Sequence, residues 1–170
     1  MPHAVIIAGA NGAGKTTFAR NFIPDAFPGA LFLNADEIQR EGESYASLGR
    51  AAREMLQRLD ECVRNRLDFV VETTLSSAQY RRRFAEWRLR GFRITLIFLE
   101  LPDVDFAVAR VAYRVTHGGH DIPEPDIRRR FERGIYHLHE TYRSEVDLWY
   151  HYKWTKDRYE LSATGKNEKF

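Results

Sequence analysis

Short apolar runs alternate along this chain with longer segments in which apolar residues recur at every third or fourth position. Four runs have the length of a strand, and they are Ala4–Ala8, Ala30–Leu33, Phe69–Val71 and Arg93–Leu101. Their apolar residues are nearly continuous rather than alternating, which is typical of parallel strands buried on both faces. The pattern therefore predicts a parallel sheet that is covered by helices.

Helical periodicity fills the segments between these runs. The clearest case lies between Tyr45 and Leu67, where the spacing of apolar residues predicts a long amphipathic helix. Alternating strands and helices imply right-handed βαβ crossovers, so the expected fold class is an α/β three-layer sandwich with a mainly parallel sheet. The aromatic tail beyond Trp149 is compatible with a last strand or a hairpin. Other helices are expected from Lys15 onward, from Ser76 or Ser77 to about Arg90, over Val104–Thr116 and over Ile127–Val146.

The turn after the first predicted strand carries the strongest chemical signal in the chain. It matches the pattern G-x-x-x-x-G-K-[ST] between a buried strand and a helix start, which is the context that this motif requires. Its glycines let backbone N–H groups face phosphate oxygens, Lys15 reaches the β- and γ-phosphates, and Thr16 is a candidate Mg²⁺ ligand. A P-loop NTPase fold is therefore expected. The predicted nucleotide-binding residues are Gly9, Ala10, Asn11, Gly12, Ala13, Gly14, Lys15, Thr16 and Thr17.

Polar residues also end the second and third predicted strands. Asp36 follows the second strand, where a carboxylate can face the γ-phosphate and accept the proton of an attacking hydroxyl. Its simpler interpretation is a helix N-cap, and the two roles are compatible. Glu72 and Thr74 end the third strand, and a carboxylate followed by hydroxyls is suited to holding an acceptor. A polar helix-capping turn is the alternative interpretation of that segment.

Arginines gather in the two helices predicted within residues 104–134. Arg110 and Arg114 are four residues apart and share one helix face, while Arg128 and Arg130 open the next helix. Guanidinium groups brought over a bound nucleotide stabilise a transferring phosphoryl group, so this region is a candidate arginine-rich lid. Arg110 is expected to contact the nucleotide, and Arg128 the acceptor. Catalytic roles for Arg114 and Arg130 are favoured over a solvated basic face.

Length and composition limit the number of domains and the class of protein that the sequence can represent. A chain of 170 residues with 44% hydrophobic content is expected to form a single domain over residues 1–170. A lone cysteine, Cys62, and the lack of any apolar run of about 20 residues favour a cytoplasmic protein without a membrane span. The formal net charge of +2 does not by itself argue for a nucleic-acid partner.

Taken in order, these motifs resemble those of the zeta-toxin-like P-loop kinases, including the bacterial group known as zeta toxin family protein or predicted ABC-type ATPase. The resemblance spans roughly Ala4 to Trp149. Its P-loop is common to many families, whereas the ordered set of segments is specific. The matching segments are Gly9–Thr17, Asn34–Ile38, Glu72–Ser76, Arg110–Val115, Gly118–Pro123 and Ile127–Arg130.

The resemblance implies a kinase that uses ATP or GTP together with Mg²⁺. Asp36 matches the base for the acceptor hydroxyl, and Glu72 and Thr74 match positions that hold the acceptor. In zeta toxins the acceptor is UDP-N-acetylglucosamine, which is phosphorylated on a sugar hydroxyl. A nucleotide sugar is therefore the implied acceptor, and an antitoxin protein is an implied partner.

The favoured function is transfer of the γ-phosphoryl group of ATP or GTP to a small-molecule acceptor. One alternative is a nucleotide-dependent regulatory ATPase module, which acceptor-dependent release of ADP distinguishes from a kinase. A less favoured alternative is a polynucleotide kinase, for which Tyr80, Phe84 and Trp87 beside the arginines at 81–83 offer stacking aromatics.

Overall fold

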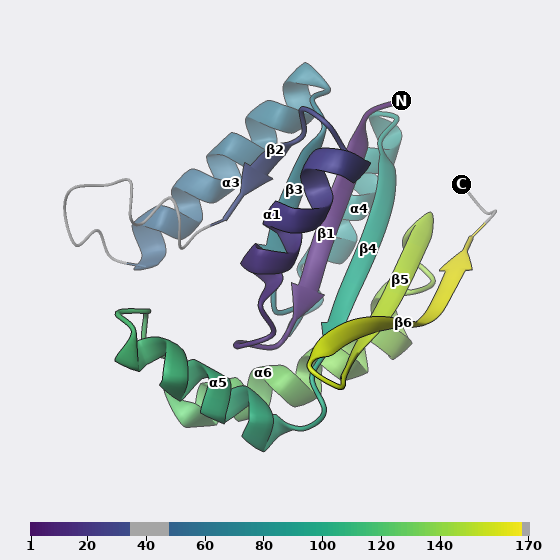
Figure 1. Ribbon diagram of the computed structural model, residues 1–170. Coiled ribbons are helices and arrows are strands. Elements are labelled where there is room, and N and C mark those ends of the chain that lie inside the picture. Colours follow the sequence, from purple (N-terminus) through teal and green to yellow (C-terminus); the bar gives the residue numbers. More distant parts are fainter. Residues whose placement is uncertain (35–47, 168–170) are drawn as a thin grey trace.

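A six-stranded sheet forms the centre of the molecule (Figure 1), with the strand order β2-β3-β1-β4-β5-β6. The computed structural model describes residues 1–34 and 48–167, with only the backbone for residues 48, 49, 51 and 52. Strands β1 to β5 are parallel, and β6 pairs antiparallel with β5. The strands are β1 (His3–Gly9), β2 (Leu31–Leu33), β3 (Phe69–Thr73), β4 (Arg93–Glu100), β5 (Leu148–Thr155) and β6 (Arg158–Lys166).

Helices cover both faces of this sheet. The helical elements are α1 (Lys15–Ala26), α3 (Leu48–Asn65), α4 (Tyr80–Leu89), α5 (Val104–Thr116), α6 (Glu124–His137) and a π-helical turn η1 (Leu138–Tyr142). One apolar cluster joins the sheet to α3, α4 and η1 through residues such as Leu59, Trp87 and Tyr142. A second cluster joins the opposite face to α1 and α5 through Ile23 and Val111. The predicted fold class is confirmed.

Three predicted helix boundaries differ in the structure. Helix α4 begins at Tyr80, after the N-cap residue Gln79, rather than at Ser76 or Ser77. The last helix begins at Glu124 rather than Ile127. Pro125 fits the first turn of this helix, because its missing N–H costs no hydrogen bond there. The helix also leaves α-geometry at Leu138 and continues as one π-helical turn instead of running to Val146. The aromatic tail that the sequence left open forms the β5–β6 hairpin.

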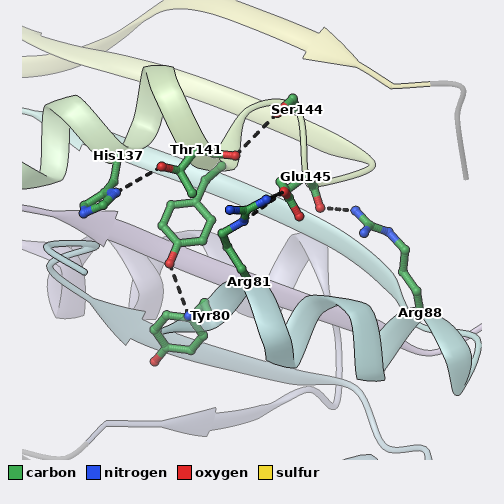
Figure 2. A network of polar contacts seen from close by, with 8 residues as sticks. Tyr80, Arg81, Arg88, His137, Thr141, Ser144 and Glu145 are labelled. Carbon is green, nitrogen blue, oxygen red and sulfur yellow. Dashed lines mark hydrogen bonds and ion pairs between the residues drawn. The ribbon is translucent and has the colours of Figure 1, made fainter. Parts of the chain in front are cut away.

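Polar contacts fix η1 and the following loop against α4 (Figure 2). The Tyr142 hydroxyl donates to the Ser77 carbonyl at 2.7 Å and accepts from the Tyr80 amide at 3.2 Å. Burial raises the pKa of this hydroxyl to about 12, so it remains a donor at neutral pH. Arg81 pairs with the Glu145 carboxylate, and Arg88 donates to the Glu145 carbonyl. These contacts hold the connection from α6 back to the sheet.

The carboxyl ends of the parallel strands meet at one edge of the sheet, and α5 and α6 lie across that edge (Figure 1). Parallel α/β sheets bind ligands at this edge. Within the described ranges, no helix combines the length and the apolar character that crossing a membrane requires.

Candidate functional site

The P-loop connects the end of β1 to the start of α1, as the sequence predicts. Gly14 adopts a left-handed conformation with φ 75° and precedes the first residue of the helix, Lys15. The Lys15 ammonium donates to the Gly9 carbonyl at 2.9 Å and to the Ala10 carbonyl at 3.0 Å. The charge of Lys15 is therefore held beside its own loop, at the positive end of the α1 dipole.

Three polar side chains from different segments meet beside the P-loop. The Thr16 hydroxyl donates to Oε2 of Glu72 at 3.2 Å, and it accepts from Nδ2 of Asn34 at 3.2 Å. Asn34 is buried, with 5% of its surface exposed. It follows β2, whereas Glu72 belongs to β3 and Thr16 to α1. The structure thus joins the predicted metal ligand Thr16 to a carboxylate that the sequence assigned to the acceptor.

Oxygen atoms of this group suit the ion that the motif implies. Mg²⁺ prefers oxygen ligands and usually takes one or two from carboxylates or hydroxyls and the rest from phosphates and water. Thr16 offers a hydroxyl and Glu72 a carboxylate, 3.2 Å apart. No cluster of three or more His, Cys, Asp or Glu side chains suited to a metal occurs in the described part of the chain. The hydroxyl of Thr16 and the carboxylate of Glu72 therefore fit a nucleotide-bound Mg²⁺.

Helix α5 passes directly over the P-loop, and Gly12 allows this contact. Gly12 has a φ of 83°, and a β-carbon there would lie 2.9 Å from the Ala107 carbonyl oxygen. Nε of Arg110 donates to the Gly12 carbonyl at 2.7 Å. A larger residue at position 12 is thus excluded by conformation and by space. This close approach brings the arginines of α5 to the phosphate loop.

A cavity of about 800 Å³ lies between α5 and the strand ends. The face that α5 presents to it contains Arg110 and Arg114, four residues apart, as the helical spacing predicts. Thr74 at the end of β3 lines the opposite side. The described residues that line the cavity are Asn11, Gly12, Gly14, Lys15, Thr16, Thr17, Arg20, Asn34, Glu72, Thr73, Thr74, Phe106, Ala109, Arg110, Tyr113, Arg114 and His117.

The other predicted arginines lie in different surroundings. Arg114 donates to the His120 carbonyl at 2.7 Å, and its Nε is buried without a hydrogen-bond partner in the described ranges. Arg130 donates to the side-chain oxygen of Asn11 in the P-loop at 3.4 Å. Arg128 instead pairs with Asp105 and Glu124, and it is not among the described residues that line the cavity. Of the described residues, Arg114 lines the cavity and Arg130 reaches the cavity-lining residue Asn11 without lining the cavity itself, whereas Arg128 does neither.

Asp36, the predicted base, lies outside the described residues. The sequence did not predict a nucleotide- or acceptor-binding role for Arg20, Asn34, Tyr113 or His117, all of which line the cavity. Helical spacing offered a signal for three of them, because Arg20 lies four residues after Thr16, and Tyr113 and His117 follow Arg110 by three and seven. Tyr113 is 69% exposed, and its ring packs on that of His117 with centroids 4.3 Å apart.

Proteins of known sequence and structure resemble this chain over most of its length. A protein from Haemophilus influenzae, described as an uncharacterized protein, is 27% identical over 132 residues, which cover 75% of this chain and 91% of that protein. A chain of the Pnkp1/Rnl/Hen1 RNA repair complex is 26% identical with a TM-score of 0.64. The match covers 79% of this chain but only 44% of that chain.

Another structural match comes from the PezAT chromosomal toxin–antitoxin system of Streptococcus pneumoniae. Its TM-score is 0.71 at 15% identity, with 96% of this chain and 72% of that chain covered, and at this identity it supports the fold alone. The family model described as Zeta toxin matches residues 1–148. Since this match covers most of the sequence, including the P-loop and both arginine-bearing helices, the chain belongs to the zeta toxin family of P-loop kinases.

Proposed function

We propose that this protein is a phosphotransferase that moves the γ-phosphoryl group of ATP or GTP to a hydroxyl of a small acceptor. One observation carries the proposal: a single cavity is lined by Lys15 and Thr16, by two arginines of α5, and by Thr73 and Thr74. The first group is suited to nucleotide phosphates and the last to a hydroxyl-bearing acceptor. The arginines between them are suited to the charge that develops during transfer.

The proposed reaction assigns each group a task. The acceptor oxygen forms a bond to the γ-phosphorus while the bond from that phosphorus to the β–γ bridging oxygen breaks, which leaves ADP or GDP. Asp36 takes the proton of the acceptor hydroxyl, as the sequence predicts. Lys15 and Arg114 stabilise negative charge on the phosphoryl oxygens. The buried Nε of Arg114, which has no protein acceptor in the described ranges, supports this role.

Thr16 and Glu72 are the residues that we propose to hold a nucleotide-bound Mg²⁺. This ion, when bound, neutralises charge on the β- and γ-phosphates. The hydrogen bond between the two side chains supports the assignment, because it places the Glu72 carboxylate beside the P-loop hydroxyl. Thr73 and Thr74 follow Glu72 at the same strand end and line the cavity, and we assign the contact with the acceptor to them.

A metabolite screen tests the function directly. Purified protein is incubated with Mg²⁺, ATP or GTP and a panel of metabolites that includes nucleotide sugars, and mass spectrometry detects the gain of one phosphoryl group. A product should form with wild-type protein and be absent with Lys15→Ala, because Lys15 is the lysine of the P-loop motif. Nucleotide hydrolysis that no acceptor accelerates would favour the regulatory ATPase instead.

A polynucleotide kinase is a second candidate, and the similarity to a chain of an RNA repair complex is the observation that favours it. The aromatics that the sequence offered for stacking, Tyr80, Phe84 and Trp87, are buried in the core and cannot stack on a base. The cavity wall instead contains the exposed ring of Tyr113 next to Arg114, and aromatic and basic side chains together bind single strands. An RNA oligonucleotide with a free 5′-hydroxyl therefore belongs in the same screen. Its phosphorylation, with nucleotide sugars left unmodified, would favour this candidate.

An antitoxin is the protein partner that we propose, since the structural match from Streptococcus pneumoniae belongs to a toxin–antitoxin system. The test is expression of this chain alone and together with the product of the adjacent gene. Growth arrest that the second protein relieves, and that Lys15→Ala abolishes, is the expected result.

A further inference from the structure

The β5–β6 hairpin reaches the phosphate site from a part of the chain that the family match does not include. That match ends at residue 148, and β5 spans Leu148–Thr155. The hairpin nevertheless packs against the second apolar cluster, which contains residues of α1 and α5, through side chains that include Trp154 and Tyr159. Its position next to the loop is the basis of this inference.

Trp154 contacts the arginine that lies over the P-loop. Cζ of Arg110 is 4.8 Å from the centroid of a Trp154 ring and 5.8 Å from that of Phe106. A β-carbon on Gly14 would lie 3.5 Å from Nη2 of Arg110, so this guanidinium is directly above the loop. Trp154 and the Gly12 carbonyl thus hold Arg110 from two sides. An arginine fixed in this way loses little side-chain freedom when a phosphate arrives.

Tyr159 contacts the loop itself. Its hydroxyl donates to the Ala13 carbonyl at 2.7 Å, although the two residues are 146 positions apart in the chain. Burial raises the pKa of this hydroxyl, while the nearby Arg110 charge acts in the opposite direction. The Tyr159 ring also packs against Trp154, with centroids 5.0 Å apart, and against Phe18 of α1 at 6.3 Å. The two hairpin aromatics therefore form one unit with the loop and α1.

We propose that the hairpin is part of the phosphate site: Trp154 positions Arg110 over the P-loop, and Tyr159 fixes the loop through the Ala13 carbonyl. Neither Trp154 nor Tyr159 is among the described residues that line the cavity, so both are positioning residues. The proposal rests on the nucleotide function proposed above. It predicts that the hairpin determines how tightly triphosphate is bound, although the family match ends where the hairpin begins.

Calorimetric titration of the full chain with MgATP tests this role. Trp154→Leu should weaken binding by about three- to thirtyfold, the range that loss of a cation–π contact implies. Trp154→Phe should retain most of the affinity, because a smaller aromatic ring still faces Arg110. In an Arg110→Ala background, Trp154→Leu should have little further effect, since the group that it positions is already gone. Tyr159→Phe should weaken binding by about two- to tenfold through loss of one hydrogen bond.

A second arginine–tryptophan contact on the same strand supplies the matched control. Arg143 lies over Trp149, with its Cζ 3.8 Å from the ring centroid, at the opposite end of β5 from Trp154. Arg143→Ala should lower the melting temperature without changing MgATP affinity. The proposal is overturned if Trp154→Leu binds MgATP like wild type, or if it weakens binding equally with and without Arg110. Wild-type protein that binds neither MgATP nor MgGTP would overturn the nucleotide function itself, and this proposal with it.

Discussion

Thr16 and Glu72 are 56 positions apart in the chain, and the hydroxyl of the first donates a 3.2 Å hydrogen bond to the carboxylate of the second. The pairing of β1 with β3 produces this contact, because Ile7 lies opposite Glu72 in the parallel register. The P-loop leaves β1 two residues later, so the helix start that follows it returns to the end of β3. Glu72 is therefore a neighbour of the phosphate loop as well as of the cavity-lining residues Thr73 and Thr74.

Glu72→Gln is expected to raise the Mg²⁺ concentration required for half-maximal ATP binding. The amide keeps the shape of the side chain but removes the negative charge beside Thr16, and a neutral oxygen is a weaker ligand for Mg²⁺. Titration of ATP binding at several Mg²⁺ concentrations measures the change. Unchanged Mg²⁺ dependence together with a higher acceptor KM would return Glu72 to the acceptor role that the sequence suggested.

Asp36→Asn is expected to lower kcat by about 10²-fold or more, the usual magnitude of general-base assistance. The substitution preserves size and most hydrogen bonds, so nucleotide affinity should change little. Steady-state kinetics with the acceptor from the screen, and a separate nucleotide titration, measure the two effects. Full kcat in this variant would remove Asp36 from the role of base.

Nucleotide binding should slow amide hydrogen exchange across residues 110–133. Arg110 and Arg130 contact the P-loop residues Gly12 and Asn11, and a triphosphate adds negative charge beside these groups. The measurement compares free protein with protein saturated by a nonhydrolysable ATP analogue and Mg²⁺. Exchange in the α4 segment serves as an internal control. Equal exchange in both states, with binding confirmed by calorimetry, argues against a nucleotide-driven lid.

Gly134→Ala should destabilise the fold by about 1–3 kcal/mol, the usual cost of overpacking. A β-carbon on this buried residue of α6 would lie 2.7 Å from the Thr74 carbonyl oxygen, so the helix must move away from the end of β3. Helix propensity alone favours alanine over glycine and predicts a gain in stability. A loss of stability therefore points to the close contact with Thr74. Urea unfolding measures the effect, with Tyr136→Ala at an exposed position of the same helix as the control. A gain in stability contradicts the close contact.

Glu100→Gln should destabilise the protein at neutral pH and lose this effect in acid. Oε2 of Glu100 accepts a hydrogen bond of 2.6 Å from Nε2 of His151, and this bond lowers the pKa of the carboxyl, while burial acts in the opposite direction. A depressed pKa stabilises the folded state above the ordinary value of 4.5, and this stabilisation is lost as pH falls through the lower folded value.

Thermal unfolding of wild type and Glu100→Gln from neutral pH into strong acid measures the difference in stability between the two proteins. This difference should be constant from neutral pH down to about 4.5, the ordinary pKa of the carboxyl, and shrink below that pH. A difference that stays constant in strong acid would show that the ionised carboxylate contributes nothing through its charge. Glu160→Gln, at an exposed salt bridge with Arg158, is the control for a surface carboxylate.

The sequence by itself determined the P-loop, the order of strands and helices, and the parallel character of most of the sheet. A P-loop is readable because its phosphate-binding groups are the backbone N–H groups of one contiguous segment, Gly9–Thr16. The strands β1, β3 and β4 are readable because burial on both faces leaves a continuous apolar run. The P-loop and the buried strands can therefore be predicted from residues that are adjacent in the sequence.

The tertiary structure decided which distant side chains share the site. Arg128 and Arg130 are close in sequence, but two residues of helix turn the side chains by about 200° relative to each other. One therefore pairs with Asp105, and the other reaches Asn11. The hairpin carries no recognisable motif, yet its pairing with β4 places Trp154 against Arg110. Such contacts follow from strand register and helix orientation, which depend on the packing of the whole chain rather than on any local pattern.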